Sequence, residues 1–84
     1  MWKIQYTQKA VKSLKKLNPN VLESLRVAIE ELKSKPDLGK QLTGSLKGLR
    51  SLRAGDFRIL YRKEIQALVV LVIAVGHRKE VYKT

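Results

Sequence analysis

Arg53 and Arg58 are the two residues whose types and spacing most directly suggest chemistry. Between them lies Gly55-Asp56, a pair typical of the two-residue loop of a β-hairpin. In such a hairpin the two arginines lie directly opposite each other, where like charges destabilise a sheet. An anion bound between them would explain the pair, and a phosphate suits the bidentate donors of guanidinium groups. Alternatively, both side chains extend into water or pair with Asp56 or Glu80.

Three residues near the C-terminus, His77, Arg78 and Tyr82, could complete a site. Cleavage of an RNA phosphodiester needs a base that activates the 2′-OH, cations that stabilise the phosphorane, and an acid that protonates the leaving 5′-oxygen. A basic face with a His and a Tyr could supply these groups without a metal. Taken singly, a His or a Tyr near a terminus is more often a packing or surface residue.

Other kinds of site are disfavoured by the residues that the sequence lacks. It has no cysteine, one histidine and seven acidic residues, so a thiolate or structural zinc site is not expected. No acidic cluster suits magnesium, and no phosphate-binding loop or nucleophile elbow occurs. We therefore expect no metal and no cofactor.

The charge of the chain indicates a polyanionic partner. Lys and Arg total 18 against seven acids, which gives a formal net charge of +11. RNA, DNA or an acidic protein segment would complement this charge. The alternatives are a ribosomal-type structural protein or a basic surface that only confers solubility. The start of the chain does not resemble a secretory signal, and the longest apolar run, Ala67–Val75, is too short for a membrane helix. We expect a cytoplasmic protein without membrane contact.

The elements that would position these residues form one α+β domain across all 84 residues. Apolar residues at helical spacing, namely Leu22, Leu25, Ile29 and Leu32, predict the buried stripe of a second helix. The predicted order is a strand at Trp2–Tyr6, a helix capped by Thr7, a helix that begins at Asn18-Pro19 and runs to about Lys35, a loop at Asp37–Gly48, a hairpin of Leu49–Ala54 and Phe57–Lys63, and a buried central strand at Leu68–Val75 that Gly76 ends.

Two segments resemble signatures of the RelE/ParE toxin superfamily. Gly48–Tyr61 (GLRSLRAGDFRILY) is similar to its LR-x-G-[DE]-[YF]-R-[VIL]-x-Y pattern, and Val75–Tyr82 (VGHRKEVY) is similar to its terminal GHR-x-x-VY pattern. The resemblance covers essentially the whole chain. It implies a RelE-like fold, in which an N-terminal strand and a helical hairpin pack on a twisted antiparallel sheet with a short C-terminal tail. It also implies a toxin of a type II toxin–antitoxin module, and RelE-like members of the superfamily are endoribonucleases (mRNA interferases). The implied partners are a cognate antitoxin and mRNA in the ribosomal A site.

The resemblance also implies roles for individual residues. Arg58 matches the arginine that stabilises the scissile phosphate, and Arg78 matches the one that assists the leaving group or the phosphate. Tyr82 matches the tyrosine that orients or activates the 2′-OH and stacks on a base. The residues expected to bind RNA are Arg50, Arg53, Lys47 and Lys79.

The sequence departs from the best-studied pattern of the family, which has two lysines on its second strand, one of them a candidate general base. Here Arg50, Ser51 and Arg53 occupy this region. Arg50 is the nearest substitute, but strict alternation along the strand would place it on the core face. An arginine is also a poor base because it hardly deprotonates, so His77 and Tyr82 remain as candidates. The alternative functions are gyrase inhibition without RNA cleavage, as in the ParE branch, and a non-catalytic basic RNA-binding module.

Overall fold

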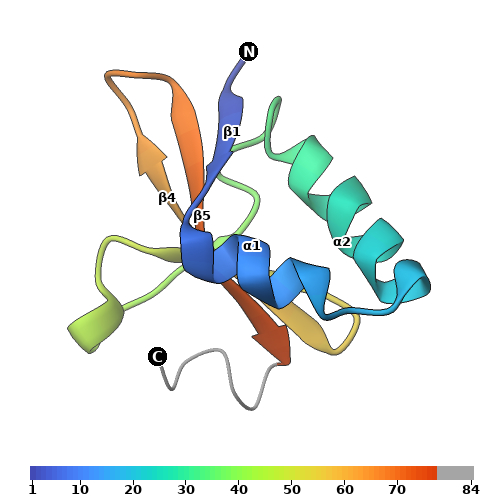
Figure 1. The fold of residues 1–84 in the computed structure, drawn as a ribbon. Helices are drawn as coiled ribbons and strands as arrows, with labels where there is room; N and C mark the ends of the chain where they lie inside the picture. The colour runs from blue at the N-terminus through green and yellow to red at the C-terminus, as the bar shows by residue number, and fades with distance from the viewer. Residues whose placement is uncertain (78–84) are drawn as a thin grey trace.

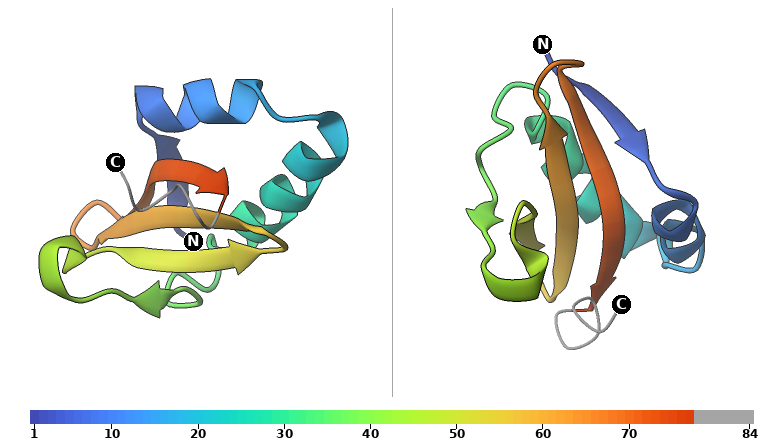
Figure 2. Two further views of the ribbon diagram at one scale, coloured as in Figure 1. Left: turned by 90° about the horizontal axis from the view of Figure 1, so that it is seen from below. Right: turned by 90° about the vertical axis from the view of Figure 1, so that its left-hand side faces the viewer.

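Two helices pack on one face of a five-stranded sheet in the computed structural model, which describes residues 1–77 (Figure 1). The left view of Figure 2 shows both helices on the same side of the sheet. The elements are β1 (Lys3–Tyr6), α1 (Gln8–Lys15), α2 (Pro19–Glu31), β2 (Lys40–Gln41), a short 3₁₀ helix (Gly44–Leu46), β3 (Arg50–Ala54), β4 (Phe57–Glu64) and β5 (Val69–His77). Within residues 1–77, no helix has both the length and the apolar character needed to cross a membrane.

Both helices begin with the caps that the sequence predicts. The Thr7 hydroxyl accepts a hydrogen bond from the Ala10 amide at 3.1 Å, and the Asn18 side chain accepts one from the Val21 amide at 3.1 Å. Pro19 follows at the first helical position. These contacts satisfy backbone donors that have no partner within the helix.

The predicted end of α2 at Lys35 is wrong, because the helix ends at Glu31. After that residue the chain tightens into turns, in which the Leu32 amide bonds to the Ile29 carbonyl at 3.0 Å. The carbonyl of Lys33 accepts a hydrogen bond from the Trp2 amide at 3.0 Å. The chain after α2 is therefore tied to the start of β1 rather than continued as helix.

The sheet has the strand order β1-β5-β4-β3-β2. The β3–β4 hairpin has the predicted register, with Ala54 opposite Phe57 and Arg53 opposite Arg58. The other neighbouring pairs are also antiparallel, except that β1 runs parallel to β5, so the sheet is mixed. The segment predicted as a loop at Asp37–Gly48 contains the two-residue strand β2 and the 3₁₀ helix.

The main core lies between the helices and the sheet. Its largest fully buried side chains include Leu25, Leu32 and Tyr61. The prediction that Leu22 belongs to the buried stripe of α2 is wrong, since it is 39% exposed, and Val21 and Ala28 pack against the core instead. The helix is thus rotated on the sheet relative to the expected stripe.

We call the sheet face turned away from the helices the open face. Its residues include the buried pair Leu60 and Ala74, against which Leu42 and Ile73 pack. The register of β4 with β5 shifts between Leu60 and Tyr61, so Ile73 is an extra residue on β5. The Thr7 hydroxyl donates a hydrogen bond to the carbonyl of Ile73 at 2.7 Å, which satisfies the backbone beside this bulge. The first helix is thereby fixed to β5, an interior strand of the sheet.

Candidate functional site

Arg53 and Arg58 are cross-strand partners on the open face. Their neighbours along the strands, Leu52 and Ile59, belong to the helix-packed core, so alternation turns both arginines to the other side. Next to Arg58, on β5, lies Gly76, which adds no side chain to this row. The predicted pairing of two guanidinium groups on one face is confirmed.

The two arginines differ in their hydrogen bonds. Arg53 is exposed, and its Nε donates to the Gly55 carbonyl at 3.1 Å. Arg58 is half-buried, and its Nε is the one buried side-chain nitrogen or oxygen within residues 1–77 that has no hydrogen-bond partner. A buried donor without a partner is rare and costs about 1–3 kcal/mol, more for a charged group. An anion bound at this position would satisfy the donor.

His77 lies on the opposite side of the sheet from these arginines. The strand predicted to end at Val75 continues to His77, where the Cα partner is Phe57. Phe57 packs against the core between helices and sheet, and the two rings meet edge to face with centroids 5.9 Å apart. The structure therefore does not bring His77 together with Arg58. The other candidates in the C-terminal segment, Arg78, Lys79 and Tyr82, lie outside the described residues.

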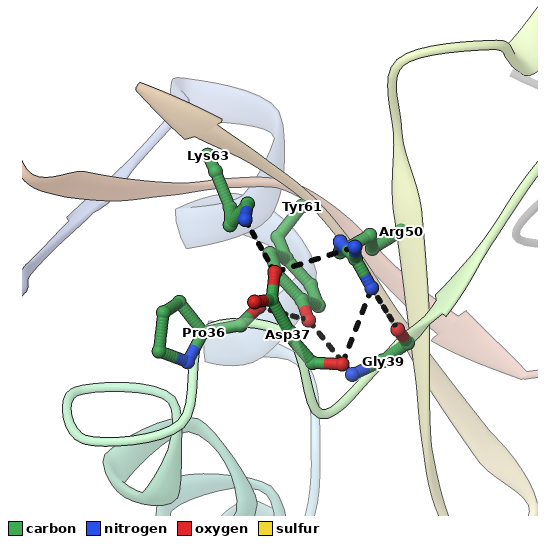
Figure 3. A network of polar contacts seen from close by, with 6 residues as sticks. All are labelled: Pro36, Asp37, Gly39, Arg50, Tyr61 and Lys63. Carbon is green, nitrogen blue, oxygen red and sulfur yellow. Dashed lines mark hydrogen bonds and ion pairs between the residues drawn. The ribbon is translucent and has the colours of Figure 1, made fainter. Parts of the chain in front are cut away.

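Arg50 also lies on the helix-packed side, as strict alternation predicts. Its Cα partner is Tyr61, and its guanidinium group binds the loop after α2 (Figure 3). Arg50 Nη1 donates to the Gly39 carbonyl at 2.7 Å and to the Asp37 carbonyl at 3.2 Å, and Nη2 lies 3.3 Å from Asp37 Oδ1. The Arg50 side chain is only 17% exposed. The guanidinium group of Arg50 is thus occupied by bonds within the protein, and this geometry does not favour the expected contact with RNA.

Tyr61 and Lys63 bind the same loop (Figure 3). The Tyr61 hydroxyl donates to the Pro36 carbonyl at 2.7 Å and accepts from the Gly39 amide at 2.8 Å, and Lys63 donates to the Asp37 carboxylate. Burial raises the pKa of Tyr61, whereas the hydrogen bond from Lys63 lowers the pKa of Asp37. We call these five residues, Asp37, Gly39, Arg50, Tyr61 and Lys63, the loop clasp.

Lys47 lies on the loop between β2 and β3, apart from the two arginines. It lines a hollow of about 690 Å³ between this loop and the end of β4, together with Leu49, Arg50, Lys63 and Ile65 among others. Within residues 1–77, no three His, Asp or Glu side chains are grouped so that they could hold a metal ion.

Lys40 is a residue of the open face that sequence reasoning missed. It belongs to β2, and its Cα partner is Ser51 of β3, which is buried on the open face beside Arg53. A two-residue strand has no periodicity that a sequence pattern could reveal. On the open face Lys40 therefore joins Arg53 and Arg58. Arg62, two positions beyond Leu60 on β4, also lies on this face, but its Nε pairs with Glu64 at 2.7 Å.

Comparisons with known proteins agree with this architecture. Residues 4–82 match the family described as the ParE toxin of the type II toxin–antitoxin system, parDE. The chain belongs to the RelE/ParE superfamily of type II toxins. It is 33% identical over 82 residues to Toxin RelG of Mycobacterium tuberculosis, covering 95% of this chain and 94% of that protein.

Solved structures of RelE/ParE toxins share the fold. One is the toxin–antitoxin complex RelBE2 of M. tuberculosis, with 33% identity, a TM-score of 0.83, and coverage of 92% of this chain and 98% of that one. Another is the isolated RelE toxin of E. coli, with 28% identity, a TM-score of 0.80, and coverage of 99% and 93%. The described part of this toxin thus has a basic open face on a RelE fold, and guanidinium groups are donors of the kind that bind phosphate and stabilise developing negative charge.

Proposed function

We propose that this toxin is a ribosome-dependent endoribonuclease that cleaves mRNA and so inhibits translation. The observation that carries the proposal is the opposed pair Arg53 and Arg58, with the buried Nε of Arg58 lacking a partner within residues 1–77. Guanidinium groups bind phosphate oxygens bidentately and can stabilise a phosphorane without the help of a metal.

In the proposed reaction the ribose 2′-oxygen attacks the adjacent phosphorus, so that the 2′-O–P bond forms and the P–O5′ bond breaks. The 2′-OH proton passes to a base, and the leaving 5′-oxygen takes up a proton from an acid. Arg58 binds the scissile phosphate and Arg53 contributes to the charge around it. Arg78 assists the leaving group and Tyr82 orients the 2′-OH, as the resemblance implies. Because His77 lies on the helix-packed side beside Phe57, we favour Tyr82 over His77 as the group that activates the 2′-OH.

We further propose that a cognate antitoxin binds this toxin. The similar structures include RelBE toxin–antitoxin complexes, and the net charge of +11 favours a partner segment rich in acidic residues. An amphipathic helix of that partner could pack on the exposed apolar side chains Val11 and Leu22 of the helices. Alternatively, the acidic segment could cover the basic open face on the other side of the sheet.

The proposed activity is tested by adding purified toxin to a bacterial translation extract and mapping the 5′ ends of the mRNA. Wild type should produce cuts within codons, and Arg58→Ala should slow cutting at least about a hundredfold, since it removes one donor to the transition state. Arg26→Ala is the matched control, because Arg26 lies on α2 and pairs with Glu23. Cutting by Arg58→Ala at the wild-type rate would contradict the mechanism.

Inhibition of DNA gyrase is the second candidate, because the matching family is described by its ParE members. A supercoiling assay separates the two. A gyrase-inhibiting toxin would block supercoiling and leave the mRNA in the translation extract intact.

A further inference from the structure

Lys40 extends the row of cations on the open face beyond the two arginines. In the antiparallel pair of β2 with β3, Lys40 is the partner of Ser51 and Gln41 is the partner of Arg50. Partner residues of an antiparallel pair project to the same face. Since Ser51 and Arg53 are two positions apart on β3, Lys40 lies about 7 Å along the strand and about 5 Å across from Arg53.

The Lys40 ammonium group forms no ion pair with another side chain in the described part of the molecule. Lys40 is exposed, and no ion pair or side-chain hydrogen bond involves it within residues 1–77. In contrast, Lys33 pairs with Glu30 and Lys63 pairs with Asp37. An exposed lysine without a carboxylate partner, beside two arginines, is suited to a polyanion that passes over all three.

The loop clasp fixes the backbone at the residue that directly precedes Lys40. The backbone amide and carbonyl of Gly39 are both hydrogen-bonded: the amide donates to the Tyr61 hydroxyl, and the carbonyl accepts from Arg50. Tyr61 fits so closely that a Cβ on Gly39 would lie 2.7 Å from the tyrosine ring. Since β2 itself has only two residues, we attribute its position to the clasp more than to its own pairing.

We propose that Lys40 binds an RNA phosphate next to the one held by Arg53 and Arg58, and that the loop clasp positions it. This inference rests on the proposed function and adds a residue to its binding surface. Lys40 is the binding residue. Asp37, Arg50 and Tyr61 act through the backbone and are positioning residues.

The binding role is tested with a single-stranded 2′-O-methyl oligoribonucleotide, which has no 2′-OH to attack, titrated against the toxin at several salt concentrations. Lys40→Gln should bind it several-fold more weakly, and the slope of log K against log salt should become shallower by about 0.7, the value for one phosphate contact on a single strand. Lys12→Gln removes the same charge from α1 and should keep the wild-type slope. A Lys40→Gln slope equal to that of wild type would overturn the inference.

The positioning role is tested with Asp37→Asn, for which two explanations predict opposite results. The substitution removes an exposed negative charge, so long-range electrostatics alone would leave binding unchanged or strengthen it. Our inference predicts weaker binding, a smaller effect of Asp37→Asn in the Lys40→Gln background, and faster amide hydrogen exchange at residues 39–42. Unchanged or tighter binding by Asp37→Asn would contradict the role of the clasp.

The two proposals fail in distinguishable ways. If wild type neither binds nor cleaves RNA, the proposed function is wrong and the role of Lys40 is excluded with it. If wild type cleaves mRNA while Lys40→Gln and Asp37→Asn both behave as wild type, the proposed function stands and the inference about Lys40 is wrong.

Discussion

Arg58 and Tyr61 are three residues apart on β4 and face opposite sides of the sheet. The hydroxyl of Tyr61 has two partners in the protein, whereas within residues 1–77 the buried Nε of Arg58 has none. A polar group that is fully satisfied internally contributes to stability, while a buried donor without a partner is better explained by a ligand. At the scale of single residues, hydrogen bonding thus distinguishes Tyr61, whose hydroxyl is satisfied within the protein, from Arg58, which we propose binds a phosphate.

Tyr61→Phe should destabilise the toxin by about 1–3 kcal/mol. It keeps the ring in the core but leaves the Gly39 amide and the Pro36 carbonyl without their partner. Urea unfolding measures the loss. Tyr6→Phe serves as the control, because Tyr6 is 42% exposed, and its midpoint should stay near that of wild type. Equal midpoints for Tyr61→Phe and wild type would show that the clasp adds little to stability.

At the scale of elements, Thr7 links α1 to β5. Its hydroxyl accepts from the Ala10 amide at the start of α1 and donates to the Ile73 carbonyl at the bulge of β5. Asn18, in contrast, only caps α2. The Thr7 side chain therefore caps the start of α1 and also joins this helix to the sheet.

We expect Thr7→Ala to cost about 2 kcal/mol of unfolding free energy and Asn18→Ala about 1 kcal/mol, because only the first removes a tertiary hydrogen bond as well as a cap. Thr7→Ser keeps the hydroxyl and should recover most of the loss. Thermal or urea unfolding of the three variants gives the comparison. Equal costs for Thr7→Ala and Asn18→Ala would mean that the bond to Ile73 contributes nothing.

The elements whose ends are set by local chemistry could be predicted from the sequence. Gly55-Asp56 fixes the hairpin register, and with it the pairing of Arg53 with Arg58. Thr7 and Asn18 fix the two helix starts. In each case one or two residues determine the geometry of the few that follow.

Features that depend on tertiary contacts could not be predicted. The end of α2 depends on the bond between Trp2 and Lys33, which are far apart in sequence. β2 forms where the loop clasp holds it and has no pattern of its own, so Lys40 was missed. His77 was expected to follow the last strand but continues it, and alternation turns it to the side of Phe57. The positions of Arg53 and Arg58 could thus be predicted, because the hairpin turn determines them. The positions of Lys40 and His77 could not, because they depend on pairing with strands elsewhere in the sheet.

At the scale of the whole molecule, basic residues lie on both sides of the sheet. α1 carries Lys9, Lys12 and Lys15 in the helical layer, and the open face carries Lys40, Arg53 and Arg58 on the other side of the sheet. A net charge of +11 favours the approach of a polyanion to either side. We propose that single-stranded RNA binds the open face and not α1.

The most direct test is a titration of isotopically labelled toxin with a 2′-O-methyl oligoribonucleotide, followed by the shifts of its backbone amide signals in NMR spectra. We predict the largest changes at Lys40, Ser51–Arg53 and Phe57–Leu60, with much smaller changes along α1. Changes concentrated on α1, with the strands of the open face unaffected, would contradict this prediction.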